Sequence, residues 1–258
     1  MDRETLIGIA NDLADAAEAV IRPHFRTPID VISKADDSPV TVADRGAEKA
    51  MRDILEARLP DHGILGEEYG TVRLGAETVW VLDPIDGTKA FLTGVTQFGT
   101  LIAAARDGVP VLGVINQPIL RERWIGVEGG GPALFNGDPI STRDCGGLGD
   151  AVLMITHPGM LKTERDRARY GRLADAVSFT RYGGDCYAYA MLAMGFSDIV
   201  IEADLAPYDF AALVPVVEAA GGVMTDWDGN RLTLASDGHV IAAATPALHE
   251  AALERLRA

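Results

Sequence analysis

Apolar residues recur every three to four positions in two stretches near the N-terminus, residues 5–25 and 43–59. This spacing puts them on one side of a helix, so we expect two amphipathic helices there. Shorter apolar runs that fit strands follow the turn at residues 60–63, namely 79–82, 98–105, 110–116 and 122–127. Asp107-Gly108, between the second and third runs, has the composition of a hairpin turn. The first half of the chain therefore predicts a sheet in which most neighbours are antiparallel.

Strands and helices alternate more regularly in the second half. The pattern predicts strands at 151–156, 177–181, 198–201 and 239–244, and helices at 163–175, 185–195, 208–220 and 246–257. Such alternation is typical of an α/β layer. The turn signal Asn136-Gly137 places the end of the first half near residue 142. The sequence has no repeat and no low-complexity linker, so we expect a single domain, 1–258, of two packed halves, approximately 1–142 and 143–258, with a cleft between them.

Composition and charge narrow the function classes. The 258 residues are 48% apolar, which is ordinary for a globular protein with a sizeable core. With 38 acidic and 23 basic residues the formal charge is −15, which disfavours nucleic acid or an anionic membrane as a partner. No signal-type segment and no run of the ~20 apolar residues needed to span a bilayer is present, so we expect a cytoplasmic protein. Its two cysteines, Cys145 and Cys186, are expected to be reduced thiols.

Two carboxylates follow the apolar run 79–82 in the heptapeptide Asp83-Pro84-Ile85-Asp86-Gly87-Thr88-Lys89. They flank a proline that stiffens the turn, and Gly87-Thr88 can begin a helix whose backbone N–H groups meet an anion. Mg²⁺ is commonly bound by one or two carboxylates together with the phosphate oxygens of a substrate. The heptapeptide therefore offers both parts of a metal-assisted phosphate site.

Further acidic clusters lie at other expected element boundaries: Asp44, the pair Glu67-Glu68, and Asp209. An isolated acid in such a place is most often a helix cap or a solvated loop residue. Their occurrence together with the heptapeptide instead favours a shared metal site. Adjacent side chains in an extended segment point to opposite faces, so only one glutamate of the pair should reach that site.

Three motifs, Gly66-Glu67-Glu68, Trp80 to Thr88 and Tyr208-Asp209 to Gly222, resemble the inositol monophosphatase-like family of metal-dependent phosphatases. The resemblance covers nearly the whole chain. It implies an α/β (α+β) fold, a layered αβαβα sandwich of the inositol monophosphatase and sugar phosphatase type. It also implies Mg²⁺ as cofactor, with about two or three ions in each active site.

The resemblance also implies a ligand set. One Mg²⁺ would be held by Glu67, Asp83 and the backbone carbonyl of Ile85, and a second by Asp83, Asp86 and Asp209. Two ions that clamp one phosphate stabilise the attacking and leaving oxygens of an in-line displacement. They also lower the pKa of a bound water, so that hydroxide is available near neutral pH.

The same resemblance assigns catalytic roles to Asp44, Glu67 and Thr88. Thr88, paired with Asp44, would orient the attacking water. The N–H groups of Gly87 and Thr88 would hold phosphate oxygens. A simple helix cap is the alternative role for Thr88, and the two roles are compatible.

The segment 181–187 joins a predicted strand to a predicted helix and contains Asp185. Asp185 is either a helix cap or a carboxylate aimed into the cleft. Glu202, at the end of another predicted strand, is placed to join it. Two acids beyond the metal ions would suit a cationic leaving group, whereas a neutral inositol or sugar would call for contacts that match hydroxyl groups.

A closer resemblance, to the histidinol-phosphate phosphatases of the same family, is carried by Gly183-Gly184-Asp185-Cys186-Tyr187, by residues 86–94 and by Glu122-Arg123-Trp124. It implies the hydrolysis of L-histidinol phosphate to L-histidinol and phosphate, a late step of histidine biosynthesis. By that similarity Asp185 and Glu202 would bind the amine and the imidazole, with Asp209 also close to the substrate.

Other functions stay open. Inositol 1-phosphate and 3′-phosphoadenosine 5′-phosphate are alternative substrates for the same chemistry. Lys89 replaces the threonine usual in inositol phosphatases, and a bisphosphorylated nucleotide would want more basic residues around the cleft. A non-catalytic metal-binding scaffold is the alternative from a different class, although all five expected acids and Thr88 are present. The family resemblance implies a homodimer that acts on a small-molecule phosphate ester.

Overall fold

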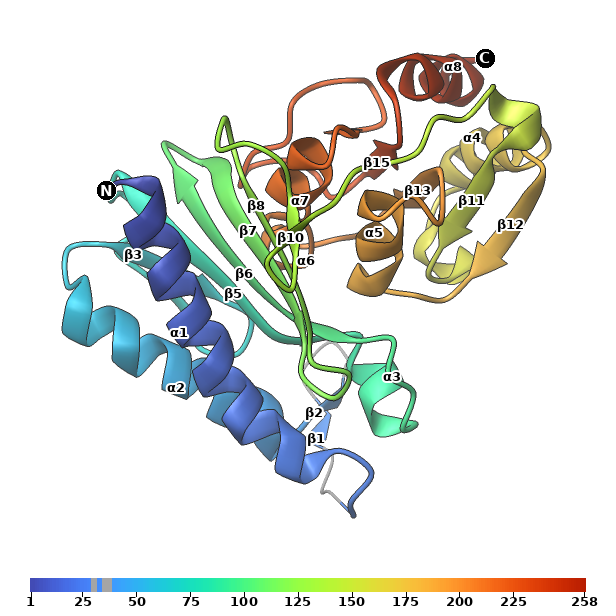
Figure 1. The fold of residues 1–258 in the computed structure, drawn as a ribbon. Helices are drawn as coiled ribbons and strands as arrows, with labels where there is room; N and C mark the ends of the chain where they lie inside the picture. Colours follow the sequence, from blue (N-terminus) through green and yellow to red (C-terminus); the bar gives the residue numbers. More distant parts are fainter. Residues whose placement is uncertain (29–31, 34–38) are drawn as a thin grey trace.

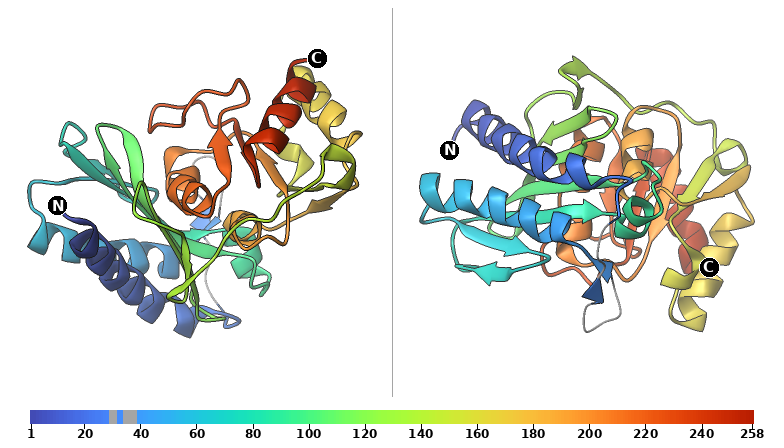
Figure 2. Two further views of the ribbon diagram at one scale, coloured as in Figure 1. Left: turned by 45° about the horizontal axis from the view of Figure 1, so that its top comes forward. Right: turned by 90° about the horizontal axis from the view of Figure 1, so that it is seen from below.

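The computed structural model describes residues 1–28, 32–33 and 39–258. Figure 1 shows two sheets that alternate with three layers of helices, so the expected αβαβα arrangement is confirmed. One outer layer holds α1 (Arg3–Ile21) and α2 (Val42–Arg58), which lie side by side against the first sheet (Figure 2). The inner layer holds α5 (Cys186–Ala193), α6 (Pro207–Phe210) and α7 (Leu213–Ala219), and the other outer layer α4 (Glu164–Ala174) and α8 (Pro246–Arg257).

The first sheet has eight strands in the order β10-β9-β8-β7-β6-β5-β3-β4. They are β3 (Gly63–Gly66), β4 (Gly70–Val72), β5 (Thr78–Asp86), β6 (Gly99–Arg106), β7 (Val109–Gln117), β8 (Glu122–Val127), β9 (Leu134–Phe135) and β10 (Asp138–Pro139). Only β3 and β5 pair in parallel within this sheet, so the antiparallel prediction is confirmed. Asp107 and Gly108 join β6 to β7 with φ values of 50° and 78°, as their hairpin composition predicts. A separate ribbon pairs β1 (Ile32–Ser33) with β2 (Pro39–Val40).

The second sheet has five strands in the order β12-β11-β13-β15-β14. They are β11 (Val152–Ile155), β12 (Phe179–Tyr182), β13 (Ile199–Glu202), β14 (Val223–Thr225) and β15 (Val240–Ala243). The first three strands in that order are parallel, and β15 is antiparallel to both of its neighbours. The predicted alternation of strands and helices is therefore present. The sequence pattern did not reveal β14, because three residues are too few for a period to be recognised.

Both sheets are buried on both faces, which explains why their strands read as continuous apolar runs. Successive side chains of a strand point to opposite faces. Along β5, Val81 enters the core between the two sheets, while Trp80 and Leu82 enter the core under α1 and α2. Along β13, Val200 faces the first of these cores, and Ile199 and Ile201 face the core under α4 and α8. Residues of both halves of the chain thus share the central core.

Two predicted helices differ from the structure because of proline. The helix expected over 208–220 is two helices, α6 and α7, since Pro215 has no N–H to donate to the carbonyl four residues earlier and its ring would crowd that group. The helix expected over 5–25 ends as an α-helix at Ile21 and continues as a short 3₁₀ turn that contains Pro23. The remaining shorter elements are α3 (Thr88–Leu92) and the 3₁₀ turns at 148–150 and 158–160.

Two glycines that face each other on β7 and β8 allow α7 to lie directly on the first sheet. Gly113 and Gly126 are cross-strand partners. A Cβ atom on Gly113 would lie 1.9 Å from the carbonyl oxygen of Ala212, and one on Gly126 would lie 2.1 Å from that of Pro215. Both oxygens belong to the backbone at α7, so any side chain there would push the helix away. The glycine pair thereby fixes the height of α7, and of α6 before it, above the sheet.

Gly113→Ala is expected to destabilise the fold by about 1–3 kcal/mol, because the added methyl group overpacks against the Ala212 backbone. Gly8→Ala is the matched control. Gly8 is exposed within α1, and a Cβ atom added there would have nothing within 4 Å, so alanine should stabilise the helix by about 0.5–1 kcal/mol. Chemical unfolding curves of both variants measure the difference. Equal stabilities for the two would contradict the close approach of α7.

Candidate metal-dependent active site

An irregularity in β5 brings two aspartates to the same side of the first sheet. Residues three apart in a regular strand face opposite sides. In the pairing of β5 with β6, however, Asp83 faces Leu101 and Asp86 faces Gly99, so β5 contains one extra residue. Such a bulge shifts the alternation by one position and returns the second side chain to the face of the first. The Asp-Pro-Ile-Asp sequence therefore becomes a pair of converging carboxylates.

Side-chain hydrogen bonds hold this bulge. The buried Thr100 donates its hydroxyl to the carbonyl of Pro84, at 2.8 Å, where the regular ladder is interrupted. The backbone N–H of Ile85 donates to Oδ1 of Asp83 at 3.0 Å. The carbonyl of Ile85, predicted to bind a metal ion, accepts a hydrogen bond from the Thr88 hydroxyl at 3.1 Å. The bulge is thus defined by its own polar groups.

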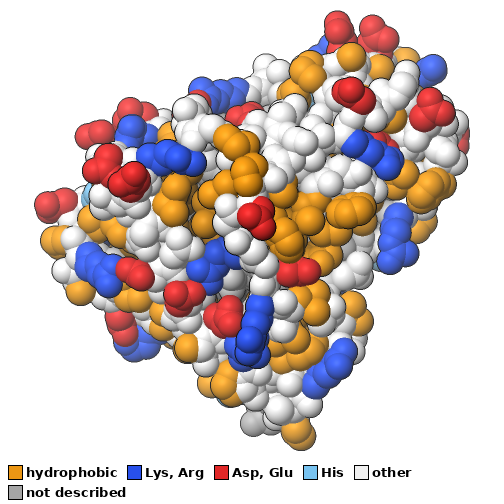
Figure 3. All heavy atoms as spheres, in the orientation of Figure 1, with side chains coloured by type: hydrophobic (Ala, Val, Ile, Leu, Met, Phe, Trp, Pro, Cys, Tyr) orange, Lys and Arg blue, Asp and Glu red, His pale blue; other side chains and the backbone are white. Residues whose placement is uncertain are grey.

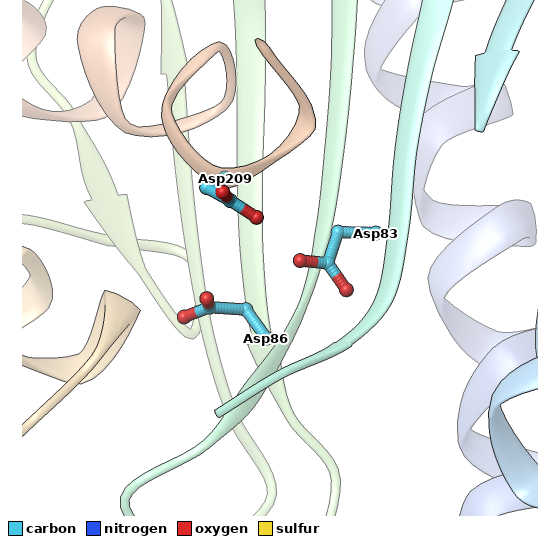
Figure 4. Close-up of side chains that lie close together, drawn as sticks. All are labelled: Asp83, Asp86 and Asp209. Atoms are coloured by element: carbon cyan, nitrogen blue, oxygen red, sulfur yellow. The ribbon is translucent and has the colours of Figure 1, made fainter. Parts of the chain in front are cut away.

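Asp209 supplies a third carboxylate from the other half of the chain. It is the third residue of α6, and its carboxylate accepts the N–H of Ala206, the residue before the helix, at 2.7 Å. Figure 4 shows Asp83, Asp86 and Asp209 converging on one point, from β5 and α6. One oxygen from each of the three lies within 4.8 Å of the others. Asp209 can therefore accept the N–H at the start of α6 and also belong to the cluster of three aspartates.

The electrostatics of this cluster fit a divalent cation. Burial raises the pKa of Asp83 well above its usual range, and the negative charges of Glu67, Asp86 and Asp209 raise it further. Burial and the charges of Asp185 and Asp209 likewise raise the pKa of Asp86, against the lowering effect of the hydrogen bond from Cys186. Oxygen ligands held together at such an electrostatic cost are what hard ions such as Mg²⁺ require. The three aspartates could hold such an ion.

Glu67 lies between two of the predicted site acids. Its N–H donates to the carbonyl of Leu82 at 3.1 Å, so it sits directly beside Asp83. Its charge contributes to the raised pKa of Asp83 and of Asp44. Glu68 instead lies near Arg45, with 3.9 Å between Nε and Oε2. Neighbouring side chains therefore diverge here as the extended segment predicts, with Glu67 on the side of the aspartates.

A buried ion pair supports the Glu67 turn, and the sequence pattern did not lead us to it. Glu48 of α2 is fully buried and accepts Nε of Arg52 at 2.7 Å. The same carboxylate accepts the backbone N–H groups of Glu68 at 2.7 Å and of Tyr69 at 3.1 Å. A Cβ atom on Gly66 would lie 2.0 Å from Oε1 of Glu48, which explains the glycine of the Gly-Glu-Glu motif. The signal was available, because Glu48 and Arg52 are four residues apart beside the apolar stripe of their helix.

Asp44 and Thr88 lie at the starts of α2 and α3, and the side-chain hydrogen bonds of both in the structure are to residues three positions earlier. Oδ2 of Asp44 accepts the N–H of Thr41 at 2.9 Å and also the Thr41 hydroxyl, as part of a capping box. Oδ1 of Asp44 is buried and has no hydrogen-bond partner within the described ranges. The Thr88 hydroxyl is directed to Ile85 instead. One oxygen of Asp44 is thus left available beside Glu67.

Asp185 lies beside the aspartate cluster, although it occupies the residue before α5. Its side chain forms no capping hydrogen bond, so the simple cap role is absent. The Asp185 carboxyl carbon would be 3.1 Å from a Cβ on Gly87. The next N–H, that of Cys186, donates to Oδ2 of Asp86 at 2.6 Å. Burial raises the pKa of Asp185 to about 6, against the lowering effect of Lys89.

Glu202 is buried at the carboxyl end of β13, near Asp185. Its Oε1 accepts the N–H of Thr156 at 3.2 Å together with the Thr156 hydroxyl, and its Oε2 accepts the hydroxyl of Tyr189 at 3.2 Å. Burial raises its pKa to about 7, and the charge of Asp185 adds to that rise. Thr156 and Tyr189 were not identified from the sequence. Thr156 could have been found, because it follows β11, the parallel neighbour of β13, and parallel strands end at one edge.

The remaining surface carries both signs of charge. On the face seen in Figure 3, basic side chains are interspersed with acidic ones and form no continuous area. Within the described part of the chain, no helix combines the length and the apolar character required to cross a bilayer.

Comparison with known proteins identifies the family of this chain. The sequence profile of the inositol monophosphatase family matches residues 2–258, and the chain belongs to that family. A solved structure described as an inositol monophosphatase from Zymomonas mobilis has a TM-score of 0.92 and 49% identity, with both chains covered completely. The fold is therefore of the inositol monophosphatase type, the protein is a phosphomonoesterase of that family, and the family depends on metal ions.

Two named relatives are similar over most of the chain. Bifunctional phosphatase IMPL2, chloroplastic, of Arabidopsis thaliana is 51% identical over 265 residues, which cover 99% of this chain and 75% of that protein. A histidinol-phosphatase of Mycobacterium tuberculosis is 36% identical over 255 residues, which cover 97% of both.

Asp83→Asn is expected to stabilise the metal-free protein. A carboxyl group whose folded pKa is raised destabilises the fold once pH exceeds its unfolded value, so at pH 7 removal of the charge should raise the free energy of unfolding. Mg²⁺ at a hundredfold excess over its Kd should stabilise the parent by about 2.7 kcal/mol and the variant by much less.

Thermal unfolding with a chelator and with Mg²⁺ tests both parts. Asp150→Asn, an exposed aspartate in a 3₁₀ turn, is the control and should change neither value. A variant that is less stable than the parent in chelator, or equally stabilised by Mg²⁺, would contradict the assignment of this cluster as a cation site.

Proposed function

We propose that this protein is a Mg²⁺-dependent phosphatase that hydrolyses L-histidinol phosphate to L-histidinol and phosphate. The observation that carries the proposal is the pair of carboxylates formed by the half-buried Asp185 and the buried Glu202, next to the three aspartates. Metal-binding acids explain the reaction with a phosphate group, but they do not explain two further acids. A leaving group with an amine and an imidazole would supply the positive charge that this pair lacks.

The proposed metal ligands are Asp83, Asp86 and Asp209, with Glu67 and the carbonyl of Ile85 completing the set. About two or three Mg²⁺ ions would lower the pKa of a bound water and offset the charge of the phosphate. The hydroxyl of Thr88 occupies the Ile85 carbonyl in the structure, so this carbonyl would bind an ion only after the hydroxyl turns away.

Asp44 and Thr88 are the proposed pair that positions the attacking water. The buried Oδ1 of Asp44 has no hydrogen-bond partner in the described part of the chain, so it can accept a hydrogen bond from the Thr88 hydroxyl. The Thr88 oxygen would then accept a hydrogen bond from the water and orient its lone pair towards phosphorus. The N–H groups of Gly87 and Thr88 are proposed to bind the phosphate oxygens.

Asp185 and Glu202 are the proposed binding residues for the leaving group, with Asp209 close to the ester. A raised pKa of about 6 for Asp185 and about 7 for Glu202 means that a nearby cation would favour their charged forms. The M. tuberculosis relative named histidinol-phosphatase supports this choice of substrate.

Inositol 1-phosphate is the second candidate substrate, favoured by the 49% identity to a Zymomonas mobilis protein described as an inositol monophosphatase. The name of the Arabidopsis relative, a bifunctional phosphatase, allows one site to act on two esters. We further propose a homodimer and a cytoplasmic location, the latter in keeping with the free thiols of Cys145 and Cys186.

Phosphate release in the presence of Mg²⁺ from histidinol phosphate, inositol 1-phosphate and 3′-phosphoadenosine 5′-phosphate tests the proposal. We expect histidinol phosphate to have the highest kcat/KM. Asp185→Asn should lower that value by roughly 10- to 100-fold, since a charge-assisted contact contributes about 1.5–3 kcal/mol.

Two outcomes would contradict the proposal in different ways. Preference for another ester would leave the metal site intact but remove the role of Asp185 and Glu202 as a cation pocket. No release from any ester would favour a non-catalytic metal-binding scaffold. Asp175→Asn, at the end of α4, is the matched control and should behave as the parent.

A further inference from the structure

Asp185 occupies a backbone conformation that normally requires glycine. The N–H of Tyr187 donates to the carbonyl of Gly184 at 2.9 Å and closes a tight turn with Asp185 as its second residue. Asp185 has φ 46° and ψ −139°, close to the type II′ geometry that glycine dominates at this position. A side chain there strains the backbone, and such strain persists only where the surroundings impose it.

Thr156 holds the strained backbone of Asp185 from one side. Its hydroxyl oxygen accepts the N–H of Asp185 at 3.0 Å. The same hydroxyl donates its proton to Oε1 of Glu202. From the other side, the N–H of Cys186 donates to Asp86 at 2.6 Å. Two consecutive N–H groups of the turn, those of Asp185 and Cys186, are therefore held by Thr156 and by Asp86.

The strained turn places the Asp185 carboxylate where a relaxed backbone would not. Its carboxyl carbon lies against Gly87, on the loop that follows the first two aspartates. Glycine at position 185 would form the same turn without strain. An aspartate in this place therefore has a purpose other than the fold, and its carboxylate is the only functional group that glycine lacks.

We propose that Thr156 is a positioning residue for leaving-group selectivity: its single hydroxyl joins the backbone of Asp185 to the carboxylate of Glu202 and so presents the two acids as one fixed pair. This inference rests on the proposed function and deepens it. Thr156 acts through the two acids and makes no contact with the substrate itself. Serine keeps the bridging hydroxyl, whereas valine keeps the shape of threonine and removes both hydrogen bonds.

The first test compares kcat/KM for histidinol phosphate with that for glycerol 2-phosphate, an alkyl ester without a cation, in the presence of Mg²⁺. Thr156→Val should lower the ratio of the two values about tenfold, mainly through a higher KM for histidinol phosphate. Thr156→Ser should keep the ratio within about twofold of the parent. Thr142→Val is the matched control, because it removes a comparable hydroxyl hydrogen bond, 2.8 Å to the carbonyl of Ala244, away from the site.

A ratio for Thr156→Val equal to that of the parent, or an equal loss for both esters, would overturn the inference. A parent enzyme without preference for histidinol phosphate would instead overturn the proposed function, and the selectivity role with it. These failures are distinguishable, because the second is visible before any variant is made.

The second test requires no activity. Asp185→Gly and Asp185→Ala both remove the carboxylate, and only glycine relieves the backbone. At an ordinary position alanine is the more stable of the two. Here we expect Asp185→Gly to melt at least about 2 °C above Asp185→Ala in the metal-free protein. A higher melting temperature for Asp185→Ala would show that position 185 is not strained, and would remove the basis of the inference.

Discussion

Carboxylates that repel one another are held in one small buried volume, and the structure around them serves to keep them there. Burial and the neighbouring charges raise the pKa of Asp83 and of Asp86, so the ionised cluster acts against folding in the absence of a cation. Local structure resists this repulsion at each member: a bulge in β5 for the two aspartates, the hydrogen bond from the N–H of Ala206 for Asp209, and the Glu48 support for the Glu67 turn. The repulsion within the site thus destabilises the fold locally, and the packing of the five layers compensates for it.

That packing depends on the positions of glycine residues. Gly113 and Gly126 let α7 rest on the first sheet, and Pro215 separates α7 from α6. Asp209 of α6 faces the two aspartates of β5 (Figure 4). The glycines that fix the height of α7 and α6 above the sheet therefore also determine where Asp209 lies.

The sequence was sufficient for elements whose period is long or whose turn chemistry is explicit. The helices under the first sheet, the strands from 79 to 127 and the Asp107-Gly108 hairpin follow from spacing, and family resemblance supplied the order of the layers. Which distant segments come into contact was beyond its reach. The spacing of Glu48 and Arg52 indicates an ion pair, and the place of Thr156 after a strand puts it at a sheet edge. Neither feature identifies residue 68 or Glu202 as the hydrogen-bond partner, because those hydrogen bonds exist only after separate elements meet. The Thr88 hydroxyl also has several acceptors within reach, and the sequence does not decide among them.

The three converging aspartates come from segments more than a hundred positions apart, two on β5 and one on α6. During synthesis, a chain that has emerged only as far as β5 carries Asp83 and Asp86 but still lacks Asp209. The three aspartates meet only when the central helices dock on the first sheet. A divalent ion held by all three would therefore bind after folding, unlike the metal of small zinc domains, which organises the chain. Such an ion would join the two halves, so its loss and the separation of the halves would be linked.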